Sequence, residues 1–335
     1  MKETFLVLGN GKSQVPIIEK ILKKKKNLIV IDKKLKLRKN FLFLKNSIYN
    51  FNKKKIFKYF KEIKVSDIVF RSSGPAILLY SYLCSIKLKN KVNITLAKSI
   101  YSKSFLEKIL KSKKIQTKPP YSMLQSNRFV IKPDAPLIGK KYVYSVNSNQ
   151  INKIKKKFKN NKVSHNKKFN IQRELDGFDI SIFFFKHYIK EKTRPLLFLQ
   201  EFNKFSKSGK LNHLGTCSPP MHKISSKLNK KIQLSIKKMN FLFKDYYGCF
   251  SLSLKVNKND FYIYELNVGL LGDSICEVFF PHYYQNDIYN IEIFNKFKKQ
   301  TIIKKKKNNK FIGIWKKKKI LHKNTFLKNI ANAYN

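Results

Sequence analysis

The stretch FYIYELN, residues 261–267, is rich in aromatic and aliphatic side chains and ends with an acid and an amide two residues apart. Because successive side chains of a β-strand point to opposite faces, Glu265 and Asn267 are predicted on the same side of one strand. Both supply hard oxygen ligands, which suit a Mg²⁺ ion that also contacts substrate phosphates. The pair taken alone is equally compatible with a simple strand end.

A second informative stretch is FVIKP, residues 129–133, which places Lys132 in an otherwise apolar strand stopped by a proline. Burying an ammonium group costs several kcal/mol unless an anion pairs with it, so Lys132 is a candidate phosphate ligand. The alternative is an edge-strand lysine that points into water, and the lysine-rich composition leaves both interpretations open.

The first 95 residues alternate strand and helix patterns, which indicates a parallel α/β unit. Apolar runs at 4–8, 28–31 and 67–70 predict strands, and the apolar positions at 15–22 and 76–86 have helical spacing. The second half has hairpin signals instead, including Asp176-Gly177 between two apolar runs. The predicted fold class is therefore α/β, with α+β character in the second half.

The turn Gly9-Asn10-Gly11 follows the first predicted strand, but it is weak evidence for a dinucleotide site. A dinucleotide fingerprint requires Gly or Ala where Gln14 stands, although Asp32 lies where a ribose-binding acid is expected. A structural turn, a small-molecule contact and a nicotinamide-dependent oxidoreductase are the three interpretations of this segment.

The composition is strongly basic, with 73 Lys+Arg against 19 Asp+Glu and a formal net charge of +54. This charge is typical of nucleic-acid binders, but only five of the basic residues are Arg, the preferred reader of phosphate and guanine. Ala is as rare as Arg, whereas Lys, Asn, Ile, Phe and Tyr are abundant, which indicates an A/T-rich codon bias. We therefore expect no nucleic-acid partner, with a basic nucleic-acid binder kept as an alternative.

Read in order, these features resemble the ATP-grasp superfamily, in particular the ligases of the carbamoyl-phosphate-synthetase and biotin-carboxylase type. The resemblance covers roughly residues 4–290, from LVLGNGKSQVPIIEKI through FVIKP and IQRELDGFDISI to FYIYELN. It implies a parallel α/β pre-ATP-grasp domain at 1–95 and a two-lobed ATP-grasp domain at 96–300, followed by a Lys-rich segment at 301–335. The smaller lobe would span about 118–170, and the larger about 171–300.

The resemblance also assigns roles residue by residue. Phosphate contacts would come from Lys103 and Lys132, with Lys140 in the loop 134–141 that matches the phosphate lid. Adenine would lie against the segment of Gln172, Arg173, Glu174 and Leu175, and Asp179 would hold the ribose. Mg²⁺ would be bound by Glu265 and Asn267, with Mn²⁺ as an alternative ion. No catalytic residue is assigned.

The expected function is that of an ATP-dependent ligase that activates a small-molecule carboxylate as an acyl phosphate for capture by an amine or similar nucleophile. Two departures from the family pattern support an alternative, a nucleotide-binding protein with weakened or lost catalysis. Ser253 stands where the family has a metal-binding acid or amide, and Gly269 where an arginine is frequent.

The remaining expectations concern the setting of the protein. No stretch approaches the ~18 apolar residues of a membrane-spanning helix, and four widely spaced cysteines indicate neither disulfides nor zinc. We expect a cytoplasmic globular protein with a small-molecule substrate and no membrane partner. The oligomeric state is open, with a homodimer among the options.

Overall fold

The structure is a computed structural model. It describes residues 3–36, 40–48, 50–61, 63–71, 74–84, 91–116, 119, 121–136, 142–164, 166–188, 193–272, 275–295, 298, 303–307, 310–316 and 319–334.

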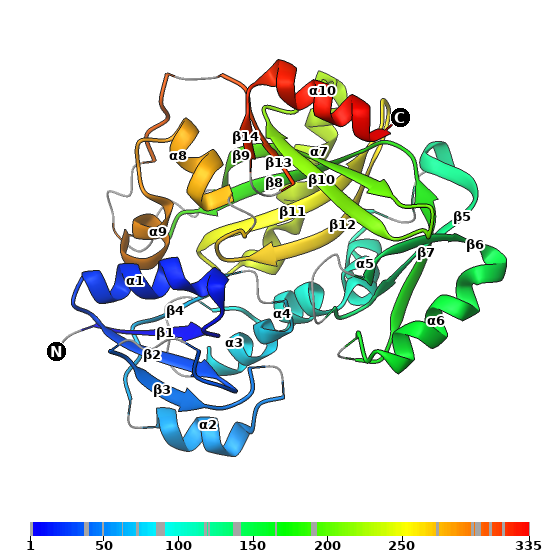
Figure 1. Ribbon diagram of the computed structural model, residues 1–335. Helices are drawn as coiled ribbons and strands as arrows, with labels where there is room; N and C mark the ends of the chain where they lie inside the picture. Colours follow the sequence, from blue (N-terminus) through cyan, green and yellow to red (C-terminus); the bar gives the residue numbers. More distant parts are fainter. Residues whose placement is uncertain are drawn as a thin grey trace.

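The first part of the described chain is a parallel sheet of four strands in the order β3-β2-β1-β4 (Figure 1). Its elements are β1 (Thr4–Leu8), α1 (Val15–Lys23), β2 (Asn27–Asp32), β3 (Leu42–Lys45), α2 (Lys53–Phe60), β4 (Asp67–Val69) and α3 (Ile77–Leu83). The strands β1, β2 and β4 are short, apolar and buried on both faces, as is typical of a parallel sheet, whereas β3 at the edge is more exposed. The expected α/β unit is confirmed.

The smaller lobe is an antiparallel sheet in the order β6-β5-β7, and among the described residues it has three strands. Its elements are β5 (Leu124–Pro133), β6 (Tyr144–Asn147), α6 (Ile151–Asn160) and β7 (Phe169–Leu175). The face of the sheet that carries Ile131, Tyr144 and Val146 packs against Ile154 and Phe158 of α6. Because side chains alternate along a strand, the opposite face of β5 and β7 is directed away from α6.

The larger lobe is built on a sheet in the order β12-β11-β8-β9-β10-β13-β14, seven strands within the described ranges, with antiparallel pairing throughout. The strands are β8 (Phe178–Lys186), β9 (Thr193–Phe205), β10 (Leu211–Ser218), β11 (Gly248–Val256), β12 (Phe261–Val268), β13 (Ile312–Trp315) and β14 (Lys319–Leu321). The remaining helices are α4 (Ile94–Tyr101), α5 (Lys103–Ser112), α7 (Ser226–Lys238), α8 (Phe280–Tyr283), α9 (Ile288–Asn290) and α10 (Lys323–Tyr334).

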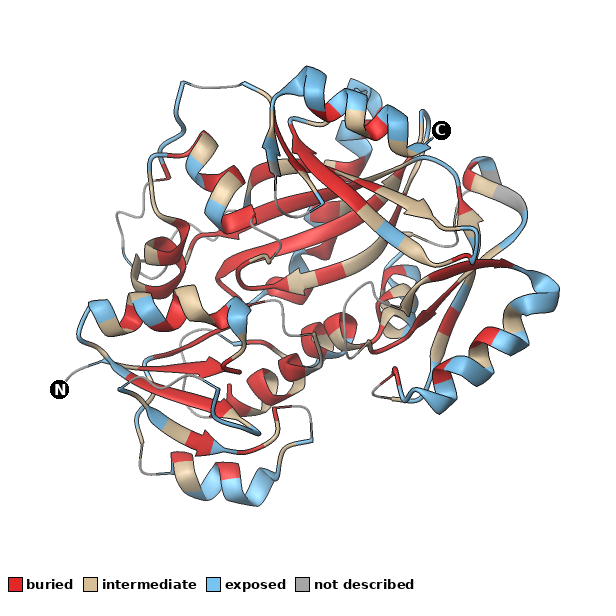
Figure 2. Ribbon diagram, viewed as in Figure 1, coloured by how far each residue is buried: buried red, intermediate tan, exposed pale blue. Residues whose placement is uncertain are grey.

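The two faces of this large sheet differ in chemistry. Apolar side chains of β8 and β11 share a core with one side of α7, namely Ile180, Ile182, Leu252, Leu254, Leu228, Ile232 and Ile236. The alternate positions Asp179, Ser181 and Ser253 carry polar groups on the opposite face of the sheet. Figure 2 shows the central strands buried and the outward sides of α2, α6 and α10 exposed. The polar face is therefore the surface available for chemistry.

The Lys-rich segment 301–335 contributes regular structure to the larger lobe. β13 pairs with β10, β14 pairs with β13, and Phe326 of α10 packs on Phe202 and Leu214. Sequence patterning had left this segment without an interpretation, because its few apolar residues are separated by lysines.

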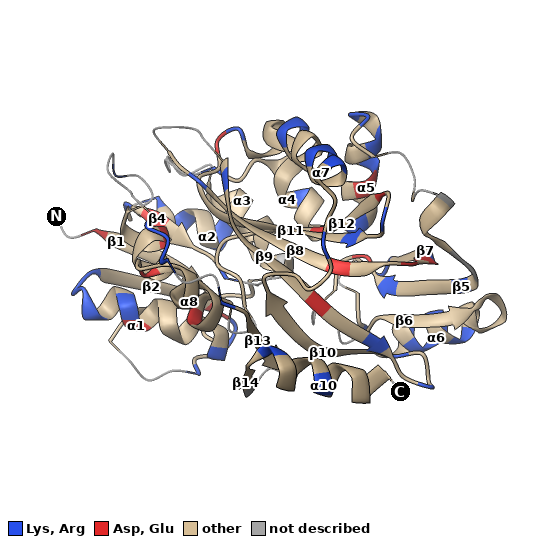
Figure 3. Cartoon of the chain, turned by 90° about the horizontal axis from the view of Figure 1, so that it is seen from above, with Lys and Arg blue, Asp and Glu red and all other residues tan. Residues whose placement is uncertain are grey.

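Figure 3 shows the Lys and Arg residues of the described chain spread over α1, α6, α7 and the sheet edges, with acidic residues in the parallel-sheet part as well as near β7 and β12. Among the described helices, none combines the length and the apolarity required to cross a membrane.

The turn after β12 joins the larger lobe to the parallel sheet. Gly269 has φ +81° and donates its N–H to the Cys249 carbonyl at 2.6 Å. A Cβ atom at this position would lie 2.2 Å from the Phe70 carbonyl oxygen, which follows β4. Only glycine fits this conformation and this contact, which explains why an arginine cannot stand here.

We predict that Gly269→Ala lowers the free energy of unfolding by at least about 2 kcal/mol, because it combines a left-handed backbone with a backbone clash. Gly11→Ala is the matched control, since Gly11 has φ −72° and no heavy atom within 4 Å of its added Cβ. Its effect should stay within about 0.5 kcal/mol in denaturant unfolding. Equal effects of the two changes would contradict the role given to Gly269.

Candidate functional site

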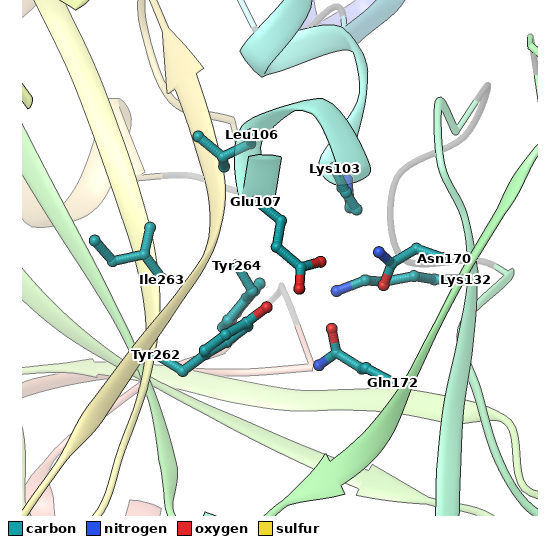
Figure 4. A pocket seen from close by; sticks show the side chains of 9 residues that line it. All are labelled: Lys103, Leu106, Glu107, Lys132, Asn170, Gln172, Tyr262, Ile263 and Tyr264. Atoms are coloured by element: carbon teal, nitrogen blue, oxygen red, sulfur yellow. The ribbon is translucent and has the colours of Figure 1, made fainter. Parts of the chain in front are cut away.

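Lys132 lies near the end of β5, on the face that is turned away from α6. Its neighbour Ile131 is fully buried in the apolar core of the smaller lobe, whereas Lys132 is 7% exposed and faces α5 and β12. Asn170 and Gln172 of β7 lie on the same face, since Lys132 pairs with Asn170 and Val130 with Gln172. Figure 4 shows these three side chains on one wall of a pocket.

Helix α5 forms the second wall and contributes Lys103 and Glu107. The two residues are four positions apart and therefore share one side of the helix. Lys103 Nζ lies 3.3 Å from Glu265 Oε1, and the Lys103 side chain is 13% exposed. In Figure 4 the Glu107 carboxylate points toward the Lys132 ammonium and the Tyr262 hydroxyl. Sequence reasoning missed Glu107, although its spacing from Lys103 was a usable signal.

Strand β12 forms the third wall, and a β-bulge determines what it presents. Ser253 of β11 pairs with Glu265, but the next residue Leu254 pairs with Ile263, so Tyr264 is the extra residue. The bulge shifts the alternation of side chains by one position. As a result Tyr262, Tyr264 and Glu265 all face the polar side, while Ile263 and Leu266 are buried in the core.

Asn267 follows the same alternation. Its neighbours Leu266 and Val268 are buried in the core, so Asn267 lies on the side of the strand that carries Glu265. Within the described ranges, no three His, Cys, Asp or Glu side chains converge as a metal site. Glu265 and Asn267 offer one carboxylate and one amide, a donor set that fits an ion completed by substrate oxygens and water.

Burial changes the proton affinity of Lys132. Desolvation and, after it, the nearby Lys103 charge lower the pKa of Lys132 to about 8, although Glu265, Glu107 and Asp179 partly oppose this. The Lys132 ammonium also lies 5.3 Å from the centre of the Tyr264 ring, a favourable cation–π contact. A cation in this position attracts an anionic ligand more strongly than a solvated lysine does.

Asp179 lies at the start of β8 in a network of polar contacts. Its carboxylate accepts a hydrogen bond from Asn203 Nδ2 at 2.8 Å and lies 3.4 Å from the Tyr264 hydroxyl. Lys255 Nζ is 3.5 Å from the same carboxylate. Through Tyr264, Asp179 is linked to the pocket that contains Lys132.

Ser253 lies directly opposite Glu265 on β11 and is 8% exposed. Its hydroxyl is 3.1 Å from the Ser181 hydroxyl, which donates to Glu201 Oε1 at 2.7 Å. The position opposite Glu265 therefore carries a neutral hydroxyl, which is linked through the Ser181 hydroxyl to the Glu201 carboxylate.

The remaining predicted site residues have different surroundings. Glu174 shares the face of Gln172, but its carboxylate is held by Arg128 and by the Ser145 hydroxyl. Leu175 is buried against Met123 and Tyr262. Arg173 is exposed and alternates to the other face of β7, so its side chain does not reach the pocket. Lys140 lies outside the described residues.

The pocket enclosed by these walls is polar at its centre and apolar at one side. Its apolar lining comes from Leu106 and the rings of Tyr262 and Tyr264. Lys103, Lys132, Glu107 and Gln172 converge on it from two lobes. This arrangement suits a ligand with a flat apolar part and an anionic part.

No family model and no curated protein matches the sequence. Solved structures do match it. An L-amino acid ligase from Bacillus licheniformis is similar over 94% of this chain and 80% of its own, with a TM-score of 0.69 and 12% identity. N5-carboxyaminoimidazole synthetase from Staphylococcus aureus, solved with ADP, is similar over 94% and 83%, with a TM-score of 0.62 and 12% identity.

A third match is the biotin carboxylase domain dimer of 2-oxoglutarate carboxylase from Hydrogenobacter thermophilus, solved with MgADP, ADP and bicarbonate. It covers 88% of this chain and 70% of its own, with a TM-score of 0.61 and 12% identity. These likenesses establish the fold: the chain has the ATP-grasp fold, as its sequence motifs predict.

The pKa of Lys132 gives a test that is independent of any ligand. Between pH 8 and about 10.4 the unfolded chain keeps a proton on this lysine that the folded chain has lost, so stability rises with pH in that range. Relative to Lys132→Met, the wild type should gain stability on the order of 3 kcal/mol across this range and show a constant difference below pH 7. Urea unfolding at several pH values measures this, and a constant difference throughout would mean that Lys132 is solvated.

Proposed function

We propose, from the ATP-grasp fold and the geometry of this pocket, that the protein is an ATP-dependent ligase. It activates a small-molecule carboxylate as an acyl phosphate, which an amine or similar nucleophile then captures. The observation that carries the proposal is the convergence of Lys103 and Lys132, from two different elements, beside the carboxylate of Glu265. The solved ligases of the same fold support this reaction class without identifying the substrate.

In the proposed complex Lys103 and Lys132 bind the phosphates of ATP. The charges of these lysines are opposed by Glu265 and Glu107, so the four residues together are close to neutral. A triphosphate therefore brings excess negative charge that the pocket does not compensate by itself. This charge balance favours binding of ATP together with a divalent cation.

Glu265 and Asn267 would hold Mg²⁺, or alternatively Mn²⁺, together with phosphate oxygens. When bound, the ion neutralises charge on the transferring phosphoryl group. Because Ser253 offers only a hydroxyl, and that hydroxyl contacts Ser181, we propose one well-held ion and a weak or absent second one.

The protein's own part in the reaction is positioning and charge neutralisation. The substrate carboxylate attacks the γ-phosphate, and Lys103 and Lys132 stabilise the charge that the phosphates carry during transfer. Leu175, Tyr262 and Tyr264 would pack against adenine, Gln172 would contact its edge, and Asp179 would bind the ribose. These residues need no general base, and none is assigned.

A nucleotide-binding protein with weakened or lost catalysis is the second candidate, and one observation favours it. Ser253 replaces a metal-binding group, and the Gly269 backbone cannot accommodate an arginine. Mg²⁺-dependent ATPase assays over a panel of carboxylates distinguish the two candidates. For both candidate functions we propose a small-molecule ligand and a cytoplasmic location. The assembly to test is a homodimer.

Removal of the Lys132 ammonium should weaken ATP binding. Lys132→Ala removes a charge-assisted contact in a desolvated site, so we expect a loss of about 2 kcal/mol, roughly a 30-fold rise in Kd. Lys26→Ala is the matched control, because Lys26 pairs with Glu3 beside the parallel sheet and does not line the pocket. Calorimetry measures both, and an unchanged affinity in Lys132→Ala would remove this lysine from the site.

Turnover should depend on Glu265. Glu265→Gln is expected to abolish ATP turnover and to retain part of the nucleotide affinity, because the two lysines still bind the phosphates. Glu3→Gln, the same change at an exposed position of the parallel sheet, should leave turnover unchanged. Ser253→Asp should lower the Mg²⁺ concentration required. Unchanged turnover in Glu265→Gln would show that Glu265 and Asn267 have no metal-binding role and only end the strand.

A further inference from the structure

Asp134 follows the Lys132-Pro133 end of β5 and is almost completely buried, with 1% of its surface exposed. Its carboxylate accepts three hydrogen bonds, from the Ser104 backbone N–H at 2.7 Å, the Ser102 hydroxyl at 2.6 Å and Asn166 Nδ2 at 2.7 Å. The family resemblance places this residue at the start of the loop 134–141 that matches the phosphate lid, but the structure places its side chain inside the protein.

These contacts join three separate segments of the chain. Ser102 is the N-cap of α5 and Ser104 lies in its first turn, while Asn166 precedes β7. The backbone of Asp134 adds two more links, because its carbonyl accepts the Lys103 N–H at 3.3 Å and its N–H donates to the Lys168 carbonyl at 3.0 Å. One residue thus fixes α5, the end of β5 and the approach to β7 to each other.

The chemistry of the contacts shows that the carboxylate is charged. Burial alone would raise the pKa of Asp134, but the hydrogen bonds from Ser102, from the Ser104 backbone and from Asn166 outweigh it and hold the pKa below its ordinary value. A carboxylate at the N-terminus of α5 also interacts favourably with the helix dipole. The charged form therefore persists at neutral pH.

The two candidate phosphate ligands lie on either side of this junction. Lys103 stands between Ser102 and Ser104, the residues that Asp134 binds, and Lys132 is two residues before Asp134 on β5. The Asp134 hydrogen bonds therefore connect the start of α5, which carries Lys103, to the end of β5, which carries Lys132.

We propose that Asp134 is a positioning residue for the phosphate site: it fixes Lys103 and Lys132 at the separation at which both contact the phosphates of one nucleotide. This inference rests on the proposed function, and Asp134 does not itself touch the nucleotide. Oriented charges raise affinity because less ordering is required when the ligand binds.

The test compares Asp134→Asn with Asp245→Asn, the same change at an exposed position far from the pocket. Kd values for ATP are measured by calorimetry, and those for adenosine, which lacks phosphates, by ligand-observed NMR. We expect Asp134→Asn to raise the Kd of ATP at least 10-fold and that of adenosine less than 2-fold, with Asp245→Asn equal to wild type. In the Lys132→Ala background, Asp134→Asn should add less than 3-fold, because one lysine of the pair is already absent.

Asn166→Ala covers the case in which Asp134→Asn does not fold, because it removes one of the three hydrogen bonds and leaves both contacts to α5 in place. It should raise the Kd of ATP 2- to 5-fold, again without a matching change for adenosine. Equal weakening of ATP and adenosine, or lower thermal stability with unchanged ATP affinity, would show a purely structural role and overturn the proposal. Absence of ATP binding in the wild type would instead overturn the proposed function itself, and the positioning role with it.

Discussion

The buried charge of Lys132 is the constraint on which the candidate site depends. An ammonium with 7% exposure is destabilising unless its surroundings compensate it, and other elements of the structure supply part of that compensation. Glu107 comes from α5, Glu265 and the Tyr264 ring come from β12, and their placement requires the two lobes to be closed on each other. Because these groups also surround the pocket, stability of the empty protein and binding of an anion depend on the same charges.

Much of the fold could be predicted from local patterns. The parallel sheet follows from short apolar strands separated by helices, and the turn between β7 and β8 follows from Asp176-Gly177. These features depend on residues near each other in the sequence, where periodicity carries the information. The C-terminal strands β13 and β14 could not be predicted. The pairing of β13 with β10 connects residues about 100 positions apart, β14 pairs only with β13, and the intervening lysines obscure the pattern.

The site could be predicted in part. Lys103, Lys132, Gln172 and Glu265 come together as the motif resemblance implies, since each stands at a fixed register in its own element. The Tyr264 bulge was not foreseeable, because a bulge depends on pairing with β11 and leaves no local signature. Alternation without the bulge would have placed Tyr264 on the face opposite Glu265. On β7, in contrast, the side chains alternate regularly, and this alternation directs the Arg173 side chain away from the pocket.

Ser253 and Gly269 show how one fold can keep a pocket and lose family groups around it. Gly269 is required by its left-handed backbone and by the approach of Phe70, so an arginine at this position is incompatible with the way the two domains meet. The backbone at Ser253 imposes no comparable restriction on the side chain, and its hydroxyl contacts the Ser181 hydroxyl. The backbone conformation and packing at Gly269 therefore exclude an arginine. The serine at position 253, in contrast, changes the metal-binding chemistry of the pocket without being required by the fold.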